Sequence, residues 1–169
     1  MWREGDYVLH GSDGVCVITD VQKLDLTGDG AAEYYILEPL YKKGLTVYVE
    51  TSDSEDSLKK PMDRQEIEQM IGQIPEYEMS WISNERERQD TLGRMLREGE
   101  LQDLFRVVAV LYRHRQELLR RGKKMRASDE QFLQRADSRI NRELAYGIGV
   151  APEQVPQYIR ERIEKEQQK

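Results

Sequence analysis

Short apolar stretches separated by turn residues mark the first sixty residues of the chain. β-branched and aromatic residues concentrate in four of these stretches, at residues 7–9, 15–21, 34–37 and 45–49. Each stretch has the length of an ordinary strand, and the intervening segments are rich in Gly and Asp, which favour turns. The pattern predicts a small, strongly bent antiparallel barrel of the SH3 or Tudor kind, in which five short strands enclose one core.

From residue 80 onward, apolar positions recur at the three-to-four-residue spacing that indicates amphipathic helices. Gly99, Gly122 and Gly149 lie at or beside the breaks in this pattern. We expect four helices, at about residues 80–97, 101–121, 128–147 and 152–166. The expected fold class is therefore α+β with two domains, a small antiparallel β-barrel followed by an all-α helical bundle.

A polar region connects these two parts. Residues 51–60 are polar and charged, which predicts a mobile loop. Asp63 followed by Glu66 matches a capping box that opens a short helix, and Ser128 followed by Gln131 is a second match. We expect a Tudor-like domain at residues 1–60, a short helix and linker at 61–79, and a helical domain at 80–169.

Charge divides the chain at the same place. The net charge is −6, but residues 1–79 carry 7 Lys/Arg and 17 Asp/Glu, whereas residues 80–169 carry 19 and 15. An acidic half should repel nucleic acid, and a half with a basic patch should attract it. The asymmetry therefore predicts two modules with different partners.

The basic charge is concentrated in residues 101–126. The first half of this segment carries an apolar stripe at helical spacing, and residues 106–126 contain eight Lys/Arg against one acid, Glu117. A solvated helix end accounts for two or three cations, because the helix dipole favours positive charge at the C-terminus. Eight cations favour a phosphate-binding surface instead, with the solvated face as the alternative.

Signals for catalysis or metal binding are weak. His10 and His114 are far apart in the sequence, and no spacing of Cys or His indicates a metal site. The single Cys16 excludes an internal disulfide and is best explained as a small buried hydrophobe. The arginines around His114 should lower its affinity for a proton. We therefore expect no enzyme activity, no cofactor and no small-molecule substrate.

The ends and apolar runs of the chain give no sign of a membrane protein. The longest apolar run, residues 107–112, is far too short to span a bilayer. The N-terminus carries charges where a signal peptide needs an apolar stretch, so we expect a cytoplasmic protein.

Trp81 stands at the expected start of the first helix of the basic half. One interpretation is a core tryptophan that packs the linker onto the helical bundle, and the residues alone favour it. The other is an exposed apolar wedge against a base step in the minor groove of DNA, which nearby arginines would support.

Several stretches together resemble a known family. Residues 5–8, 14–18, 34–37 and 45–49 look like the N-terminal module of the CarD/CdnL family of bacterial transcription regulators. The same module occurs as the RNA-polymerase-interacting domain of the transcription-repair coupling factor. Trp81, the arginines after it and the break at Gly99 resemble the start of the family's helical DNA-binding module. The resemblance covers roughly residues 2–160.

The resemblance implies a specific mechanism. The Tudor-like module of such proteins binds the β subunit of RNA polymerase by pairing at a sheet edge. The helical module lies on promoter DNA beside the melted region, contacting the minor groove and phosphate backbone with little sequence specificity. There the family's tryptophan hinders closure of the bubble.

Carried over by position, the resemblance names two sets of residues. The DNA-binding residues are Trp81 as the wedge and, as phosphate contacts, Arg86, Arg88, Lys123, Lys124 and Arg126. The polymerase-binding strand is Leu45, Thr46, Val47, Tyr48 and Val49. Tyr48 stands where some family members carry an arginine. An alternative function is a structural adaptor, in which the Tudor-like domain recruits RNA polymerase and the helical domain binds another protein.

Overall fold

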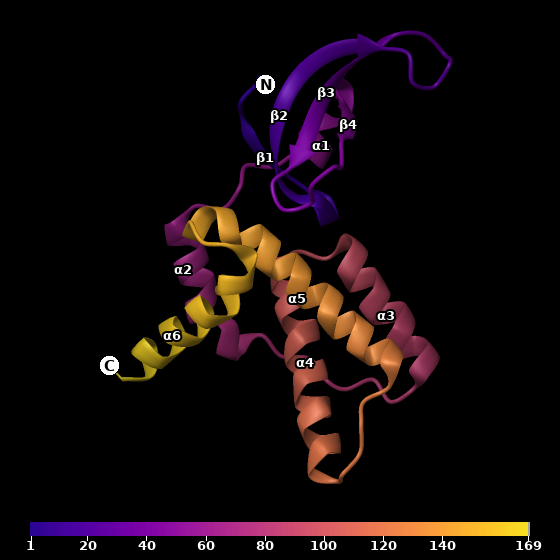
Figure 1. Ribbon diagram of the computed structural model, residues 1–169. Coiled ribbons are helices and arrows are strands. Elements are labelled where there is room, and N and C mark those ends of the chain that lie inside the picture. The colour runs from indigo at the N-terminus through magenta and orange to yellow at the C-terminus, as the bar shows by residue number, and fades with distance from the viewer. Residues whose placement is uncertain (169) are drawn as a thin grey trace.

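A curled four-stranded antiparallel sheet occupies one end of the molecule and helices occupy the other, in a computed structural model that describes residues 1–168 (Figure 1). The strands pair in chain order, and they are β1 (Tyr7–His10), β2 (Gly14–Leu24), β3 (Ala32–Pro39) and β4 (Val47–Glu50). The predicted α+β class is confirmed at this level. Lys169, the last residue of the predicted helical domain, lies outside the described residues.

The sheet curls because its longest strand bends. The register between β2 and β3 shifts between Ile18 and Asp20, and such a bulge increases the local twist. The concave face buries Val8, Cys16, Ile18, Tyr35, Leu37 and Val49, which lie in the predicted strand stretches, and also Leu58, which does not. The sheet is a half-barrel: within residues 1–168 it has four strands, so our expectation of five is wrong. Lys59 instead bridges to Leu9, with two backbone hydrogen bonds of 2.7 and 3.0 Å.

Residues 51–60 are not the loop that their polarity predicted. They form a 3-10 turn, η2 (Thr51–Asp53), and a short helix, α1 (Ser54–Ser57). Leu58 is buried in the sheet core and anchors the segment. One apolar side chain at the right place outweighs the polar composition around it.

The helical predictions are confirmed to within a few residues, except at the start of α3. The structure has α2 (Arg64–Gly72), η3 (Ile74–Glu76), α3 (Glu85–Glu98), α4 (Leu101–Arg120), α5 (Ala127–Ile148), η4 (Pro152–Gln154) and α6 (Val155–Gln167). Within residues 1–168, no helix is long and apolar enough to cross a membrane.

Caps explain where the helices begin. Asp63 and Glu66 form the predicted capping box, with both hydrogen bonds at 2.8 Å. The prediction for Ser128 is wrong, because α5 begins one residue earlier at Ala127. The first long helix begins at Glu85 rather than near residue 80, since the Asn84 side chain accepts a hydrogen bond from the Glu87 backbone.

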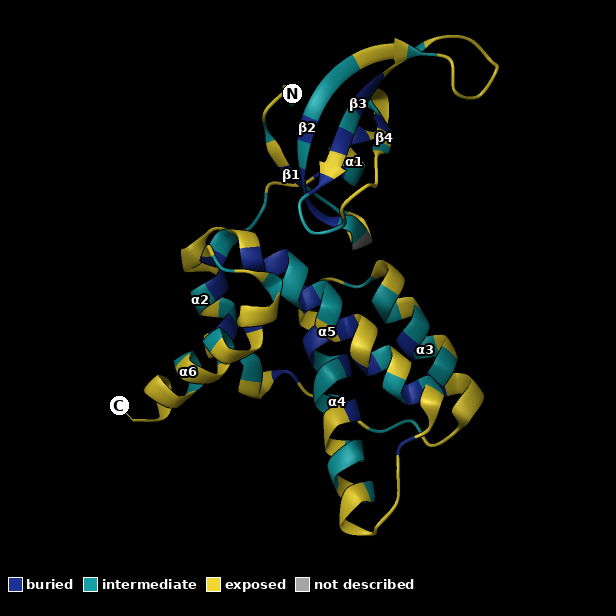
Figure 2. Ribbon diagram, in the orientation of Figure 1, coloured by how far each residue is buried: buried dark blue, intermediate teal, exposed yellow. Residues whose placement is uncertain are grey.

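The antiparallel pair α4 and α5 forms the centre of the helical part, and Figure 2 shows their buried faces turned toward the neighbouring helices. On one side α2 and α6 pack around Leu104 and Leu144, and on the other α3 packs around Leu111 and Leu133. At Gly147, a side chain would meet Ile67 and the backbone of Met62, so only glycine permits this close approach of α2 and α5.

The sheet contacts the helices through α5. Tyr7 of β1 stacks on Tyr146, with ring centroids 5.0 Å apart. Gly14, at the start of β2, has a φ of 75° and faces the Arg142 side chain. The segment between β3 and β4 also lies beside α5, since Tyr41 and Lys43 line a hollow together with Ser138 and Arg142.

Candidate nucleic-acid interface and sheet edge

Trp81 lies in the linker before α3, held between two helices. Its ring stacks on His114 of α4, with centroids 3.6 Å apart and 16° between the planes. The Arg88 guanidinium of α3 lies 4.5 Å from the indole centroid, within the range of a cation–π contact. The indole is half-buried and packs against the core shared by α3, α4 and α5. Trp81 therefore has the packing of a structural tryptophan and still presents part of its ring to solvent.

A buried ion pair supports this arrangement. The Arg88 Nε and Nη2 atoms lie 3.0 and 3.2 Å from the two carboxylate oxygens of Asp129 on α5. Arg88 is 4% exposed and Asp129 is 1% exposed. Arg88 Nη1 also donates to the Ile82 carbonyl at 3.0 Å, which ties down the linker next to Trp81. Arg88, named above as a phosphate contact, is thus a positioning residue for Trp81 in this structure.

His114 adds no positive charge to this surface near neutral pH. Burial lowers the pKa of the imidazole, and Arg88 and Arg121 lower it further, whereas Asp129 raises it. The lowered pKa agrees with our expectation from the sequence. The main cause is different, since desolvation outweighs the neighbouring arginines.

The segment between α4 and α5 brings exposed cations to Trp81. Met125 is buried in the adjacent core and anchors this segment, while Lys123, Lys124 and Arg126 remain exposed. Trp81 lines a hollow of about 250 Å³ together with positively and negatively charged residues. These include Arg88, Lys124, Arg126, Glu85 and Asp129. The structure therefore brings together four of the six predicted DNA-binding residues.

The other two predicted contacts, Arg86 and Lys123, are exposed and do not line this hollow. Arg86 belongs to the first turn of α3, between Glu85 and Glu87. Lys123 precedes Lys124 in the connection after α4. Both can reach a ligand larger than the hollow itself.

Acidic residues from other elements neutralise part of the basic segment. Six of its eight cations have a carboxylate partner within 4 Å, in the pairs Arg106–Asp103, Arg113–Glu78, Arg115–Glu130, Arg120–Glu117, Arg121–Glu117 and Arg126–Glu85. Within residues 1–168, Lys123 and Lys124 make no such pair. Counting along the sequence overestimated the excess charge, but exposed pairs are weak and exchange readily for a phosphate.

The predicted polymerase-binding strand lies at an edge of the sheet. β4 pairs only with β3 in the strand order, so its other side is an outer edge. Tyr48 is 47% exposed, and Leu45 and Thr46 are exposed in the turn before the strand. Val47 and Val49 point the other way and pack on the sheet core. Alternation along β4 thus separates a core face from a face that can meet a partner.

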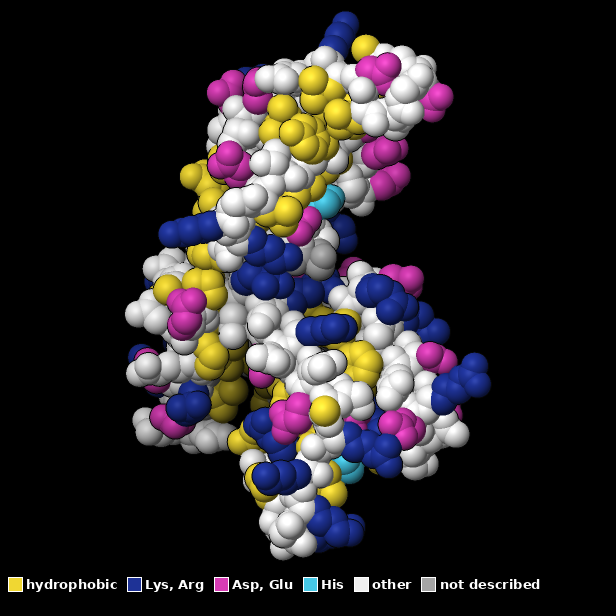
Figure 3. All heavy atoms as spheres, turned by 45° about the vertical axis from the view of Figure 1, so that its right-hand side comes forward, with side chains coloured by type: hydrophobic (Ala, Val, Ile, Leu, Met, Phe, Trp, Pro, Cys, Tyr) yellow, Lys and Arg dark blue, Asp and Glu magenta, His cyan; other side chains and the backbone are white. Residues whose placement is uncertain are grey.

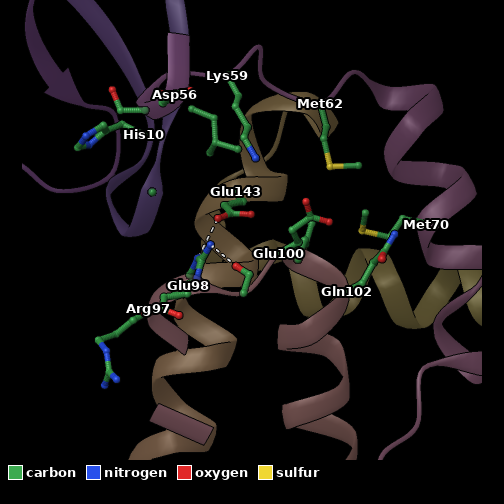
Figure 4. A pocket seen from close by; sticks show the side chains of 16 residues that line it. His10, Asp56, Lys59, Met62, Met70, Arg97, Glu98, Glu100, Gln102 and Glu143 are labelled. Carbon is green, nitrogen blue, oxygen red and sulfur yellow. Dashed lines mark hydrogen bonds and ion pairs between the residues drawn. The ribbon is translucent and has the colours of Figure 1, made fainter. Parts of the chain in front are cut away.

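A cavity of about 450 Å³ lies between the sheet and the helices, and polar side chains in its lining form hydrogen bonds within the protein (Figure 4). Burial raises the pKa of the Glu143 carboxyl, and the nearby Arg139 opposes this shift. Arg139 donates to Glu143 at 3.0 Å and to the carbonyls of Leu96 and Gly99 at 2.7 and 3.0 Å. These bonds join α5 to the end of α3.

A metal-binding cluster and the thiol of Cys16 were the remaining chemical candidates among the described residues. In residues 1–168, no group of three or more His, Cys, Asp or Glu side chains has the geometry to hold a metal ion. Cys16 is buried, and burial raises the pKa of its thiol to about 11. Such a thiol is a poor nucleophile.

Comparison with known proteins identifies the sheet unit. A family model described as the CarD-like/TRCF RID domain matches residues 2–62, which comprise the sheet, α1 and the bridge to Lys59. No curated protein matches the chain in the corresponding search. The CarD-like/TRCF RID type is an interaction domain whose partner is RNA polymerase. Residues 2–62 of this chain are therefore similar to the CarD-like/TRCF RID domain.

Proposed function

We propose that this protein is a cytoplasmic transcription regulator that binds RNA polymerase and stabilises the open promoter complex. In this proposal residues 1–60 form a Tudor-like domain that binds the polymerase β subunit, and residues 80–169 form a separate DNA-binding domain. The observation that carries it is the hollow in which Trp81 meets Lys124 and Arg126, in a chain whose N-terminal part matches an RID domain.

The sheet edge supports the protein contact. An exposed edge strand offers backbone groups to an extended segment of a partner, and exposed side chains add specificity. β4 combines such an edge with the exposed side chain of Tyr48, and the exposed Leu45 and Thr46 directly precede the strand. We propose these three as side-chain contacts and the Val47 and Val49 positions as backbone contacts.

The helical part supplies the DNA contact. Lys123, Lys124 and Arg126 are exposed and would contact phosphates, and the exposed Arg86 would extend the surface along α3. The exposed part of Trp81 is the group that would contact the minor groove, because Arg88 and His114 hold the indole in one orientation. A side chain that is already fixed loses little conformational entropy on binding.

Tethering makes a weak contact effective. Binding to the polymerase raises the local concentration of the helical part at the promoter. A ligand shifts an equilibrium only by the difference between its affinities for the two states. A preference of about 1.4 kcal/mol for the edge of the melted region would give tenfold more open complex.

Promoter-opening kinetics with purified polymerase test this proposal. We expect the protein to lengthen the lifetime of the open complex and Trp81→Ala to remove this effect while polymerase binding persists. Trp81→Phe, which keeps an aromatic ring on His114, controls for misfolding when both variants are checked by thermal melting. Loss of polymerase binding in a folded Trp81→Ala variant would contradict the proposed division of roles.

A structural adaptor is the second candidate. The ion pairs of Glu117 with Arg120 and Arg121 favour it, because they lower the net positive charge at the end of α4. DNA binding measured against salt separates the two functions, since phosphate contacts give a steep negative slope and an adaptor gives almost none.

A further inference from the structure

A second cationic surface lies on the helical part, away from Trp81. A groove of about 670 Å³ runs between the C-terminal half of α3 and the middle of α5. Its cations are Lys42, Arg97, Arg135, Arg139 and Arg142, and none of the described residues that line it is acidic. Leu96 and Phe132 add apolar surface to the lining. Figure 3 shows Lys and Arg side chains gathered over α5 where it passes beneath the sheet.

Three distant segments build this groove. Arg135, Arg139 and Arg142 recur along α5 at spacings of four and three, which places them on one face of the helix. Arg97 comes from the last turn of α3. Lys42 comes from the segment between β3 and β4, whose Tyr41 and Lys43 line a hollow together with Arg142 of α5. The cations are therefore assembled by the fold and are not a run in the sequence.

Four of the five cations fall into two groups, those paired within the protein and those exposed. Arg139 is committed to Glu143, Leu96 and Gly99, and Lys42 Nζ lies 3.3 Å from Asp13 on the sheet side. Arg97 and Arg135 are exposed. Arg97 turns its guanidinium away from the cavity in Figure 4, and its Nη1 lies 3.2 Å from where a side chain at Gly93 would begin. Arg97 and Arg135 are thus the cations that face a ligand.

This surface is separate from the hollow beside Trp81. The two sites share no lining residue. Asp129, which pairs with Arg88 behind Trp81, lies about 120° around α5 from Arg135, given 100° per residue. Substitutions at one site can therefore leave the other intact.

We propose that this groove binds the phosphodiester backbone of DNA as a second contact. The inference rests on the proposed DNA-binding function and adds to it a surface that the sequence did not reveal. The exposed guanidinium groups of Arg97 and Arg135 face this groove from two helices, no described residue that lines it is acidic, and positive charge of this kind attracts a phosphate backbone. Guanidinium groups also match the geometry of phosphate oxygens. Duplex and single-stranded DNA share this backbone.

The test compares full-length variants in DNA binding between about 50 and 200 mM salt, with a duplex and a single strand of the same sequence. We expect Arg97→Gln/Arg135→Gln to weaken binding about tenfold at low salt. Loss of two phosphate contacts should also lower the salt slope on duplex by about 1.8. Arg97→Lys/Arg135→Lys should keep the slope, because lysine still binds phosphate as a point charge. The form of DNA, duplex or single strand, for which the groove variant loses more affinity is the form that the groove binds.

The matched control is Arg160→Gln/Lys165→Gln, which removes the same charge from exposed positions on α6. An equal loss in this control would overturn the inference, since net charge alone would then explain it. If the groove variant bound DNA like the wild type while Lys123→Gln/Lys124→Gln bound DNA more weakly, the inference would be overturned and the proposed function would stand. If the wild-type protein showed no salt-dependent affinity for DNA, both this inference and the proposed DNA-binding function would be wrong. Binding of poly-glutamate that depends on the groove, with DNA binding unchanged, would make it a protein site and also overturn the inference.

Discussion

Each end of the contact between α3 and α5 has an arginine–carboxylate pair, buried at one end and partly buried at the other, and the two pairs have different roles. Near the start of α3, Arg88 binds Asp129 and supports an aromatic ring that partly faces solvent. Near the end of α3, Arg139 binds Glu143 and also donates a hydrogen bond to the carbonyl of Gly99, between α3 and α4. Both arginines belong to the basic half of the chain, yet both are engaged in contacts within the protein. A count of positive residues is therefore a poor measure of a binding surface.

Arg88→Ala is the strongest test of this comparison. Removing the guanidinium leaves Asp129 buried without its partner, so we expect a loss of about 3–5 kcal/mol in the free energy of unfolding. Denaturant titration measures it. Arg86→Ala, an exposed position on the same helix, is the matched control and should stay within about 0.5 kcal/mol of the wild type. Equal effects at the two positions would remove the supporting role of Arg88.

Arg139→Ala should cost less, about 2–3 kcal/mol. Glu143 already has a raised pKa, so it can take up a proton when its partner is lost, whereas the carboxylate–guanidinium bond is gone. The same titration measures this loss, with Arg135→Ala as the exposed control on α5. If Arg139→Ala lowered the free energy of unfolding more than Arg88→Ala, the Arg139–Glu143 pair would be the more stabilising of the two.

Lys123→Gln/Lys124→Gln should leave the free energy of unfolding within about 0.5 kcal/mol of the wild type, because both side chains are exposed. DNA affinity should still fall, with a salt slope lower by about 1.8 for two lost phosphate contacts. Salt-dependent binding assays check this. An unchanged slope would remove both lysines from the interface.

The smallest expected effect is on the pH dependence of stability through His114. Its folded-state pKa lies below the ordinary 6.5, so the unfolded chain binds more protons once the pH falls below about 6.5. Stability should therefore decrease on acidification through this range, and His114→Gln should reduce the decrease. Thermal melts between about pH 5 and pH 7 measure it. If His114→Gln lost stability more steeply than the wild type on acidification, a lowered pKa of His114 would be contradicted.

Local periodicity predicted most of the fold. The strands and helices appear where apolar spacing placed them, because strand and helix patterns depend on neighbouring residues. The start of α3 was placed too early because Trp81 and Ile82 fit the apolar pattern, although the Asn84 cap was visible in the sequence. The helical turn before Leu58 was missed because its polar composition resembles a loop.

The candidate site was less accessible to sequence reasoning. Arg88 and Asp129 are 41 residues apart, so nothing local distinguishes this arginine from an exposed one. The acids that neutralise the basic segment, such as Glu78 and Glu130, also come from other elements. Only the packing of α3, α4 and α5 determines which cations face solvent.

The bridge between Leu9 and Lys59 has a consequence for how the sheet can associate. It occupies the middle of the outer side of β1, and β4 remains as the side on which another strand can be added. Copies of a protein extend one another into filaments only when both sides of a sheet accept a neighbour. This domain can therefore take on one extended chain and then stop growing.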